Sequence, residues 1–335
     1  MALRVFLYDA RGHDREIELT DDVLDGLDEQ SLLWIDVDNR DEHDLARVAK
    51  NLALCDECLI VITHKGELTL DNYGEYVGFS VEAAPQHGPD DSERHNALEP
   101  VAHSVESGRV DFVVGKNWLV TVHDGPLNFL TRFREQDKAE TMIGLLSSQA
   151  LAASLLDWHM GAFFDEVSRI ETAVDHLDER VLREASSRGV LGRMVAMRRR
   201  VARLRSHIVR QREIIYGLSR PDFALITDAG ASPFYEALGS RFERALDEVE
   251  RTRDLVTGSF ELFVSRSSEQ TNELVKLLTF LTAIIGFCAA VAGLMGMNFD
   301  MTFFKTGTRG FLAVTGSLVV ISAVSVLFAR RRGWL

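Results

Sequence analysis

Residues 277–299 read LLTFLTAIIGFCAAVAGLMGMNF, a run of 23 residues without one ionisable side chain. A helix of about 20 apolar residues is long enough to cross the hydrocarbon core of a bilayer. After a short polar-to-mixed segment, a second apolar run begins at Gly310. We therefore predict a membrane protein with two adjacent spans, residues 277–297 and 310–329, joined by an external loop over residues 298–309.

The charge of the chain lies almost wholly outside this hairpin. The net charge is −14 over 335 residues, yet residues 277–335 contain Asp300 as their single acid. The same segment carries basic residues at Lys305, Arg309 and Arg330 to Arg332. An acidic body on a membrane anchor argues against nucleic acid as a partner and is compatible with a cation as the ligand.

The two ends of the chain indicate the topology. The first residues show no basic segment followed by an apolar one, so we expect no secretory signal and a large soluble part that stays in the cytoplasm. The basic tail, residues 330–335, follows the second span, as the positive-inside rule expects of a cytoplasmic end. We predict a multi-pass protein of the cell (inner or plasma) membrane with both termini in the cytoplasm.

Residues 1–125 alternate short apolar runs with turn-forming residues, which predicts a cytoplasmic α/β domain. A helix is expected over Glu42–Leu54, and a surface loop over Ala84–Glu99. Strands are expected at the apolar and β-branched runs Leu3–Tyr8, Leu32–Val37, Leu59–Thr63, Tyr76–Val81, Val110–Val114 and Trp118–Val122.

Residues 126–232 change to long helical patterns. Asp157–Glu184 has apolar residues at steps of three and four and acids on its other faces. Arg193–Arg220 has a similar apolar stripe and many arginines. We predict that the acidic and basic helices pair antiparallel, joined near Gly189 and Gly192.

A single very long helix is predicted next. No proline occurs between Pro233 and Met297, so one helix of roughly 95 Å can run from the cytoplasmic body into the bilayer. Residues 233–276 form its cytoplasmic stalk. The apolar stripe of the stalk fits packing against helices of the same chain and equally fits a self-associating bundle around an axis.

The motifs around the first span carry a specific likeness. Asn272-Glu273-Leu274-Val275-Lys276 precedes the span, Gly296-Met297-Asn298 ends it, and Arg330-Arg331-Arg332 follows the second span. In order and spacing this resembles the CorA family of divalent cation channels along the entire chain. The resemblance implies an α+β membrane protein with an N-terminal cytoplasmic α/β domain, a long helical stalk and a C-terminal transmembrane hairpin, assembled as a homopentamer.

One face of the first span is the candidate pore lining. Steps of three and four place eight residues on one side of the helix: Asn272, Val275, Leu278, Thr282, Gly286, Ala289, Gly293 and Gly296. By the resemblance this side faces the pore, with Asn272 at the cytoplasmic end. Val275 and Leu278 would form a hydrophobic constriction that gates by dewetting. Ordinary helix packing explains the same apolar and small residues.

The outer mouth is expected to select the ion. No carboxylate lies within the span, and Mg²⁺ gives up its water reluctantly, so we expect it to pass largely hydrated. The selectivity residues are then Gly296, Met297, Asn298 and Asp300, with the Asn298 amide offering oxygens to the waters of the ion. The alternative role for Asn298 is a helix C-cap.

The resemblance further implies regulation by Mg²⁺ bound to cytoplasmic carboxylates, which makes the ion both substrate and regulator. The family's regulatory aspartate near the start of the stalk falls at Ala237 here, next to Glu236. Each candidate also suits a solvated surface. The candidate regulatory carboxylates are Asp165, Asp175, Asp178, Glu179 and Glu236.

The leading functional prediction is a passive Mg²⁺ channel whose partners are copies of itself, the lipid bilayer and divalent cations. The sequence contains no Gly-x-x-x-x-Gly-Lys-[Ser/Thr] loop and no catalytic arrangement, so we expect neither an enzyme nor a cofactor. One alternative is a Zn²⁺, Co²⁺ or Ni²⁺ transporter of ZntB type, proton-coupled or not, with His159, His176 and His207 as softer ligands. Another is a membrane-anchored sensor or scaffold.

The three cysteines, Cys55, Cys58 and Cys288, fit a reducing compartment. Cys55-Asp56-Glu57-Cys58 has the spacing of a metal or redox pair. A zinc site would need ligands beyond the nearest histidine, His64, and the sequence holds no second cysteine pair. This favours a structural or incidental role for the pair.

Overall fold

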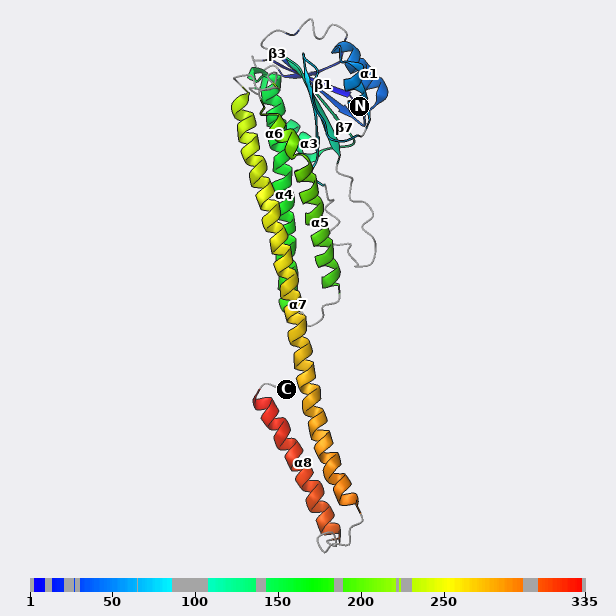
Figure 1. Cartoon of the computed structure of the whole chain (residues 1–335), viewed down its shortest axis with the longest axis vertical. Coiled ribbons are helices and arrows are strands. Elements are labelled where there is room, and N and C mark those ends of the chain that lie inside the picture. The colour runs from blue at the N-terminus through cyan, green and yellow to red at the C-terminus, as the bar shows by residue number, and fades with distance from the viewer. Residues whose placement is uncertain are drawn as a thin grey trace. The chain divides into compact units, whose positions relative to one another are not determined.

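The fold comes from a computed structural model of the chain (Figure 1). It forms two compact units, Met1–Ser259 (unit 1) and Phe260–Leu335 (unit 2). Helix α7 (Ser232–Gly296) contributes residues to both. The residues that the structure describes are 3–9, 14–20, 27, 31–64, 66–85, 108–136, 143–183, 189–220, 223, 231–297 and 307–332.

Unit 1 contains a seven-stranded sheet with the order β2-β1-β3-β7-β6-β5-β4. The central pair, β3 and β7, is parallel, and every other neighbouring pair is antiparallel. The strands are β1 (Leu3–Asp9), β2 (Arg15–Ile17), β3 (Ser31–Asp38), β4 (Leu70–Asn72), β5 (Val77–Glu82), β6 (Arg109–Val114) and β7 (Trp118–His123).

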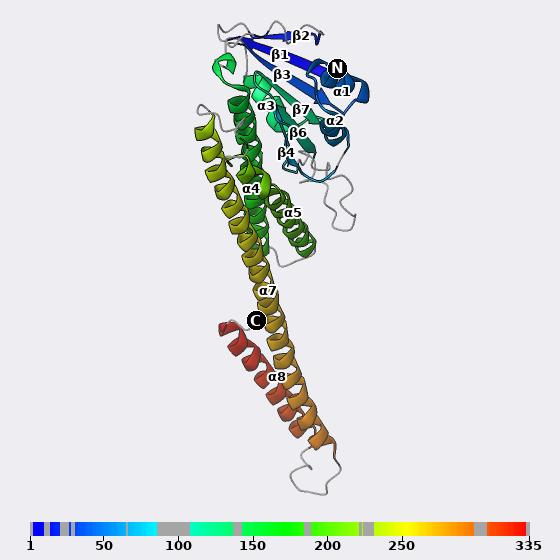
Figure 2. The ribbon, with the colours of Figure 1, turned by 45° about the horizontal axis from the view of Figure 1, so that its top comes forward.

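Helices cover both faces of this sheet (Figure 1, Figure 2). Side chains alternate along a strand, so Leu33 and Ile35 of β3 pack on one face and Trp34 on the other. The first face is covered by α1 (Glu42–Asn51) and α2 (Asp56–Thr63). The second is covered by α3 (Asn128–Gln136) and α4 (Ser148–Arg183). The predicted α/β character of this region is confirmed.

The strand predicted over Leu59–Thr63 is wrong, because these residues belong to α2. The helix begins at the N-cap Cys55 and carries Asp56 and Glu57 in its first turn, where acids stabilise the positive end of a helix. Only Cys58 and Ile62, four residues apart, are buried, whereas Ile60 is 59% exposed. A five-residue apolar run does not distinguish strand from helix by periodicity alone.

The helical part of unit 1 packs the predicted acidic helix against the predicted basic one. Glu166 of α4, whose side chain is 1% exposed, accepts a hydrogen bond of 2.5 Å from Arg200 of α5 (Val190–Arg210). The expected pairing is therefore confirmed. A 3₁₀ turn, η1 (Ile143–Leu145), precedes α4.

The basic helix is shorter than predicted. It ends at Arg210, and a separate helix, α6 (Arg212–Gly217), follows. Gln211 lies at the break, fully buried, and its side-chain amide donates hydrogen bonds to the backbone oxygens of Glu82 and His207. These contacts hold the backbone at the break between α5 and α6. The apolar spacing of the sequence predicts an uninterrupted helix there.

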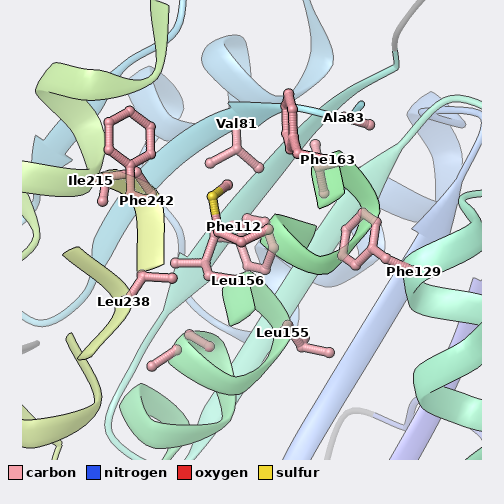
Figure 3. Close-up of a cluster of buried hydrophobic side chains, with 14 of the residues drawn as sticks. Val81, Ala83, Phe112, Phe129, Leu155, Leu156, Phe163, Ile215, Leu238 and Phe242 are labelled. Atoms are coloured by element: carbon pink, nitrogen blue, oxygen red, sulfur yellow. The ribbon is translucent and has the colours of Figure 1, made fainter. Parts of the chain in front are cut away.

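The first part of α7 completes the core of unit 1. Phe242 lies beside Ile215 of α6 and belongs to the same buried cluster as Phe163 of α4 and Phe112 of β6 (Figure 3). Further along, Thr252 and Ser259 donate hydrogen bonds to Glu171 and Asp178 of α4. Of the two alternatives for the stalk, packing within the chain therefore holds up to Ser259. Beyond it, from Phe260 on, many of the large apolar side chains are exposed, among them Leu274, Leu281 and Ile285.

Unit 2 is a helical hairpin. It consists of α7 from Phe260 to its end at Gly296 and of α8 (Gly307–Arg331), which lie side by side (Figure 1, Figure 2). Both helices are long and apolar enough to span a membrane. The two predicted spans are thus helical over nearly all of their predicted lengths.

Candidate ion pathway

The contact between α7 and α8 uses one stripe of each helix. The half-buried residues of the first span recur at steps of three and four: Leu277, Phe280, Ile284, Cys288 and Val291. Those of α8 follow the same rule: Gly310, Val314, Leu318, Ser322, Ser325 and the buried Ala329. Cys288 Sγ lies 3.6 Å from Ser322 Oγ, which sets the two stripes against each other. This stripe was not among the predicted functional residues, although its spacing of three and four is visible in the sequence.

The predicted pore lining occupies the other side of the first span. At 100° per residue, the eight predicted residues centre roughly 170° away from the stripe that faces α8. All eight are exposed in the single chain, and Val275 and Leu278 are 54% and 66% exposed. The apolar constriction residues are therefore not used to pack the hairpin. They are available to another copy of the chain, to lipid or to a water-filled axis.

The glycines of this face make no close contact within the chain. A Cβ atom added at Gly286, Gly293 or Gly296 would meet nothing within 4 Å. Small residues at a hairpin interface would be needed to let the two backbones approach. Hairpin packing therefore does not account for these three glycines.

The hydroxyl of Thr282 adds polarity to the same face. It donates a hydrogen bond of 2.7 Å to the backbone oxygen of Leu278, one turn earlier. The hydroxyl hydrogen of Thr282 is thereby used within the helix. The hydroxyl oxygen keeps lone pairs that can accept hydrogen bonds from water. The face offers acceptors without a charge.

The outer end of the pathway is described only up to Met297. The last turn tightens there, with the Met297 amide donating to the backbone oxygen of Leu294 at 3.4 Å. Gly296 and Met297 are both exposed. Asn298, Asp300 and the predicted external loop up to residue 306 lie outside the described residues, as does the C-cap alternative for Asn298.

The candidate regulatory carboxylates are spread along unit 1. Asp165 pairs with Arg132, and Glu179 pairs with Arg183 at 3.5 Å. Asp178 accepts from Ser259, while its Oδ1 atom is buried without a hydrogen-bond partner. Asp175 and Glu236 are exposed. Within the described part of a single chain, no three of these five gather into a ligand cluster.

The three histidines considered as softer ligands are not brought together either. His159 is buried between the rings of Phe129 and Phe163 and hydrogen-bonds Gln211. His207 pairs with Glu82 at 2.9 Å. His176 is exposed on α4. Among the residues that the structure describes, the one cluster with metal-ligand proximity comprises Asp41, His43 and Asp44 at the exposed start of α1.

Comparison with known proteins agrees with this architecture. The family model described as CorA-like Mg²⁺ transporter protein matches residues 29–331. The cobalt/magnesium transport protein CorA of Thermotoga maritima is 26% identical over 234 residues, which cover 70% of this chain and 66% of that protein.

Two solved structures show the same fold. The complete structure of the CorA magnesium transporter from Methanocaldococcus jannaschii matches with a TM-score of 0.74 and 17% identity, over 100% of this chain and 99% of that one. The structure of the full-length CmaX protein matches with a TM-score of 0.69 and 19% identity, over 98% and 96% of the two chains. Because the family model covers most of its length, and a two-span hairpin follows a long helix and an α/β body, this chain belongs to the CorA-like Mg²⁺ transporter family.

Proposed function

We propose that five copies of this chain surround a pore lined by the exposed face of α7 and let Mg²⁺ enter the cytoplasm down its electrochemical gradient. The observation that carries the proposal is the separation of the two faces of α7. One face packs on α8, and the opposite face is uncharged, exposed and glycine-rich.

A single hairpin cannot enclose a water path, so conduction requires several copies. The exposed glycines of α7 suit this arrangement, because they let neighbouring helices approach closely around an axis. The number five is taken from the resemblance to the family. The orientation, with the acidic unit 1 and both termini on the cytoplasmic side of the cell (inner or plasma) membrane, is proposed from the charge distribution of the sequence.

In this proposal the ion crosses the membrane with most of its water. Mg²⁺ dehydrates reluctantly, and the described pore face offers no carboxylate that would replace its water ligands. The hydroxyl oxygen of Thr282 would accept from the waters of the ion, and a ring of Asn298 side chains would select it at the outer mouth. Rings of Val275 and Leu278 would close the pore by dewetting.

The proposed transport is driven by the membrane potential and needs no coupled chemical reaction. The membrane potential is worth about 2.3 kcal/mol per charge per 100 mV, and twice that for a divalent cation. Feedback by internal Mg²⁺ would use carboxylates from neighbouring subunits. Asp178 is the candidate that the geometry favours, since its Oδ1 atom is buried without a partner in the described chain.

Mg²⁺ uptake into proteoliposomes, reported by an enclosed dye, tests the proposal. The Asn298→Ala variant should lose roughly tenfold or more of the flux, because it removes the amide oxygens at the mouth. Thr315→Ala, on the exposed side of α8, is the matched control and should keep wild-type flux. Background flux from folded, oligomeric wild-type protein would exclude a channel. Equal flux in Asn298→Ala and wild type would exclude the role of Asn298.

A second cation is favoured by one comparison, since the Thermotoga maritima relative is named for cobalt and magnesium. The same liposomes, loaded in a competition series with Mg²⁺, Co²⁺, Ni²⁺ and Zn²⁺, rank the ions. Repeating the series with and without a pH gradient separates passive flux from proton coupling, because only a coupled transporter changes its rate with the gradient.

A further inference from the structure

Two thiols lie together at the start of α2. Cys55 is the N-cap residue and is exposed, and Cys58, three residues later, is 1% exposed. The Cys58 backbone amide donates a hydrogen bond to Cys55 Sγ at 3.5 Å. The sulfur of Cys55 therefore lies next to the helical turn that contains Cys58. The backbone of Cys55 is fixed as well, because its amide donates to the Tyr76 hydroxyl at 2.7 Å.

We propose that Cys55 and Cys58 form a reversible dithiol–disulfide pair that reacts with low-molecular-weight disulfides of the cytoplasm. The spacing of the two residues suits such a bond. Cα atoms three residues apart on a helix are about 5 Å from each other, within the range of about 4.4–6.8 Å that disulfides adopt. In this arrangement the exposed Cys55 thiol can attack the small disulfide, and the buried Cys58 thiol can then displace the small thiol from the mixed disulfide.

The reaction proceeds in two exchanges. The Cys55 thiolate attacks one sulfur of the disulfide RSSR, forms a mixed disulfide with RS, and releases the other half as RS⁻. The Cys58 thiol then loses its proton to water and attacks Cys55 Sγ, which breaks the mixed disulfide and releases the second RS⁻. In sum, two protein thiols and RSSR give one protein disulfide and two RSH. The protein is oxidised and the small disulfide is reduced.

The surroundings of the pair assign the order of attack. Burial raises the pKa of the Cys58 thiol to about 12, with the neighbouring Cys55, Asp111 and Asp71 acting in the same direction. Cys58 therefore stays protonated in the reduced protein and reacts only once a mixed disulfide stands beside it. Cys55 is the accessible thiol that meets the reagent first.

The geometry does not fit a metal site at the pair. The histidine that sequence analysis named as nearest, His64, is the C-cap of α2, at the other end of the helix, where its Nδ1 atom contacts the backbone oxygen of Ile60. Among the residues with described side chains, no third His, Cys, Asp or Glu joins the two thiols within metal-ligand distance. Two thiols alone leave a zinc ion short of ligands.

The test uses the full-length protein in detergent, equilibrated with oxidised and reduced glutathione as the probe. Samples are denatured, their free thiols are labelled with a maleimide, and the mass is measured. Wild type should change from three labelled cysteines to one. At fixed oxidised glutathione, a tenfold change in reduced glutathione should change the ratio of oxidised to reduced protein about a hundredfold, because two thiols are released.

Three matched variants assign the thiols. Cys58→Ala should accumulate a mixed disulfide with glutathione at Cys55, because no resolving thiol remains. Cys55→Ser, which keeps a good N-cap, should leave Cys58 unmodified. Cys288→Ser should cycle like wild type. Size-exclusion elution identical to wild type shows that each variant is folded.

The proposal is overturned if wild type keeps three free thiols in excess oxidised glutathione. It is equally overturned if the disulfide joins two chains on a non-reducing gel, or if Cys58 is glutathionylated in Cys55→Ser. None of these results depends on ion flux, so the thiol pair and the channel are judged separately.

Discussion

At the scale of single residues, His159 shows how the environment decides protonation. The imidazole is fully buried, with the rings of Phe129 and Phe163 each 5.3 Å from it, centroid to centroid. Its Nε2 atom hydrogen-bonds the Gln211 side chain at 2.8 Å. Burial lowers the pKa of His159 to about 4, and the bond to Gln211 offsets only part of that effect. The side chain is therefore neutral in the folded protein at physiological pH.

This burial makes the stability of unit 1 depend on pH. The pKa of a histidine is about 6.5 in an unfolded chain, so between this value and about 4 the unfolded state binds more protons than the folded one. The free energy of unfolding should therefore fall as the pH drops through this window. Between about pH 7 and about pH 5 the loss from His159 is about 2 kcal/mol.

The measurement is the urea-induced unfolding of unit 1 in the full-length protein at the two pH values. His159→Gln keeps a hydrogen-bonding side chain beside Gln211 and removes the titration. Its stability should fall less than that of wild type on acidification. The pairs Asp36–His123 and Glu82–His207 occur in both proteins, so their contributions cancel in the difference. Parallel pH dependences in the two proteins would contradict the assignment.

The acids of α4 look alike in the sequence and differ widely in the structure. Glu166 is buried and held by Arg200 and Arg169, whereas Asp175 is exposed. Residue type and helical spacing predict which face is apolar. They do not predict which single acid is buried beside an arginine from another helix, because this depends on the register between α4 and α5.

At the scale of elements, α7 presents two faces to two different environments. Ile284 lies on the stripe toward α8, and Thr282, two residues earlier, lies on the exposed face. If the exposed face lines a water-filled axis, a cysteine at position 282 meets aqueous reagents, while one at position 284 is shielded by α8.

This contrast gives a matched pair of variants in a background without the native cysteines (Cys55→Ser, Cys58→Ala and Cys288→Ser), because the exposed Cys55 would otherwise be labelled as well. A charged, membrane-impermeant thiol reagent should label Thr282→Cys and reduce Mg²⁺ flux roughly tenfold or more, because the adduct occupies the pore. Ile284→Cys should remain unlabelled and keep its flux. Labelling of both positions, or of Ile284→Cys alone, would place the water path elsewhere on the hairpin.

Elements with a strong periodic or compositional signal were predicted well. The spans at 277–297 and 310–329 correspond to the end of α7 and to α8. A run of about 20 apolar residues is a strong signal for a membrane-spanning helix. The short run Leu59–Thr63 was wrong because its length suits strand and helix alike. The break at Gln211 was missed because it depends on contacts with Glu82 and His207. The outer mouth at Asn298 stays a prediction.

At the scale of the whole molecule, the proposal requires an assembly. Native mass spectrometry of the full-length protein in detergent should give a complex of about 188 kDa, five times the 37.5 kDa of one chain. Replacing Gly286 by leucine should weaken it, since a bulky side chain on the exposed face keeps neighbouring α7 helices apart. Ala313→Leu, on the exposed side of α8, is the control. A monomer under conditions that preserve flux would exclude the pentamer.

The sheet of unit 1 ends on both sides in very short strands. β2 and β4 have three residues each, and beyond β4 the backbone oxygen of Glu82 in β5 accepts from Gln211 instead of from another strand. A long, unpaired edge strand can form backbone hydrogen bonds with a strand of another chain, which leads to aggregation. The proposed ring would hold identical sheets at a high local concentration, which favours pairing between their edge strands. In the proposed assembly, the short edge strands would limit polymerisation through the sheets, and the exposed face of α7 would supply the contact between subunits.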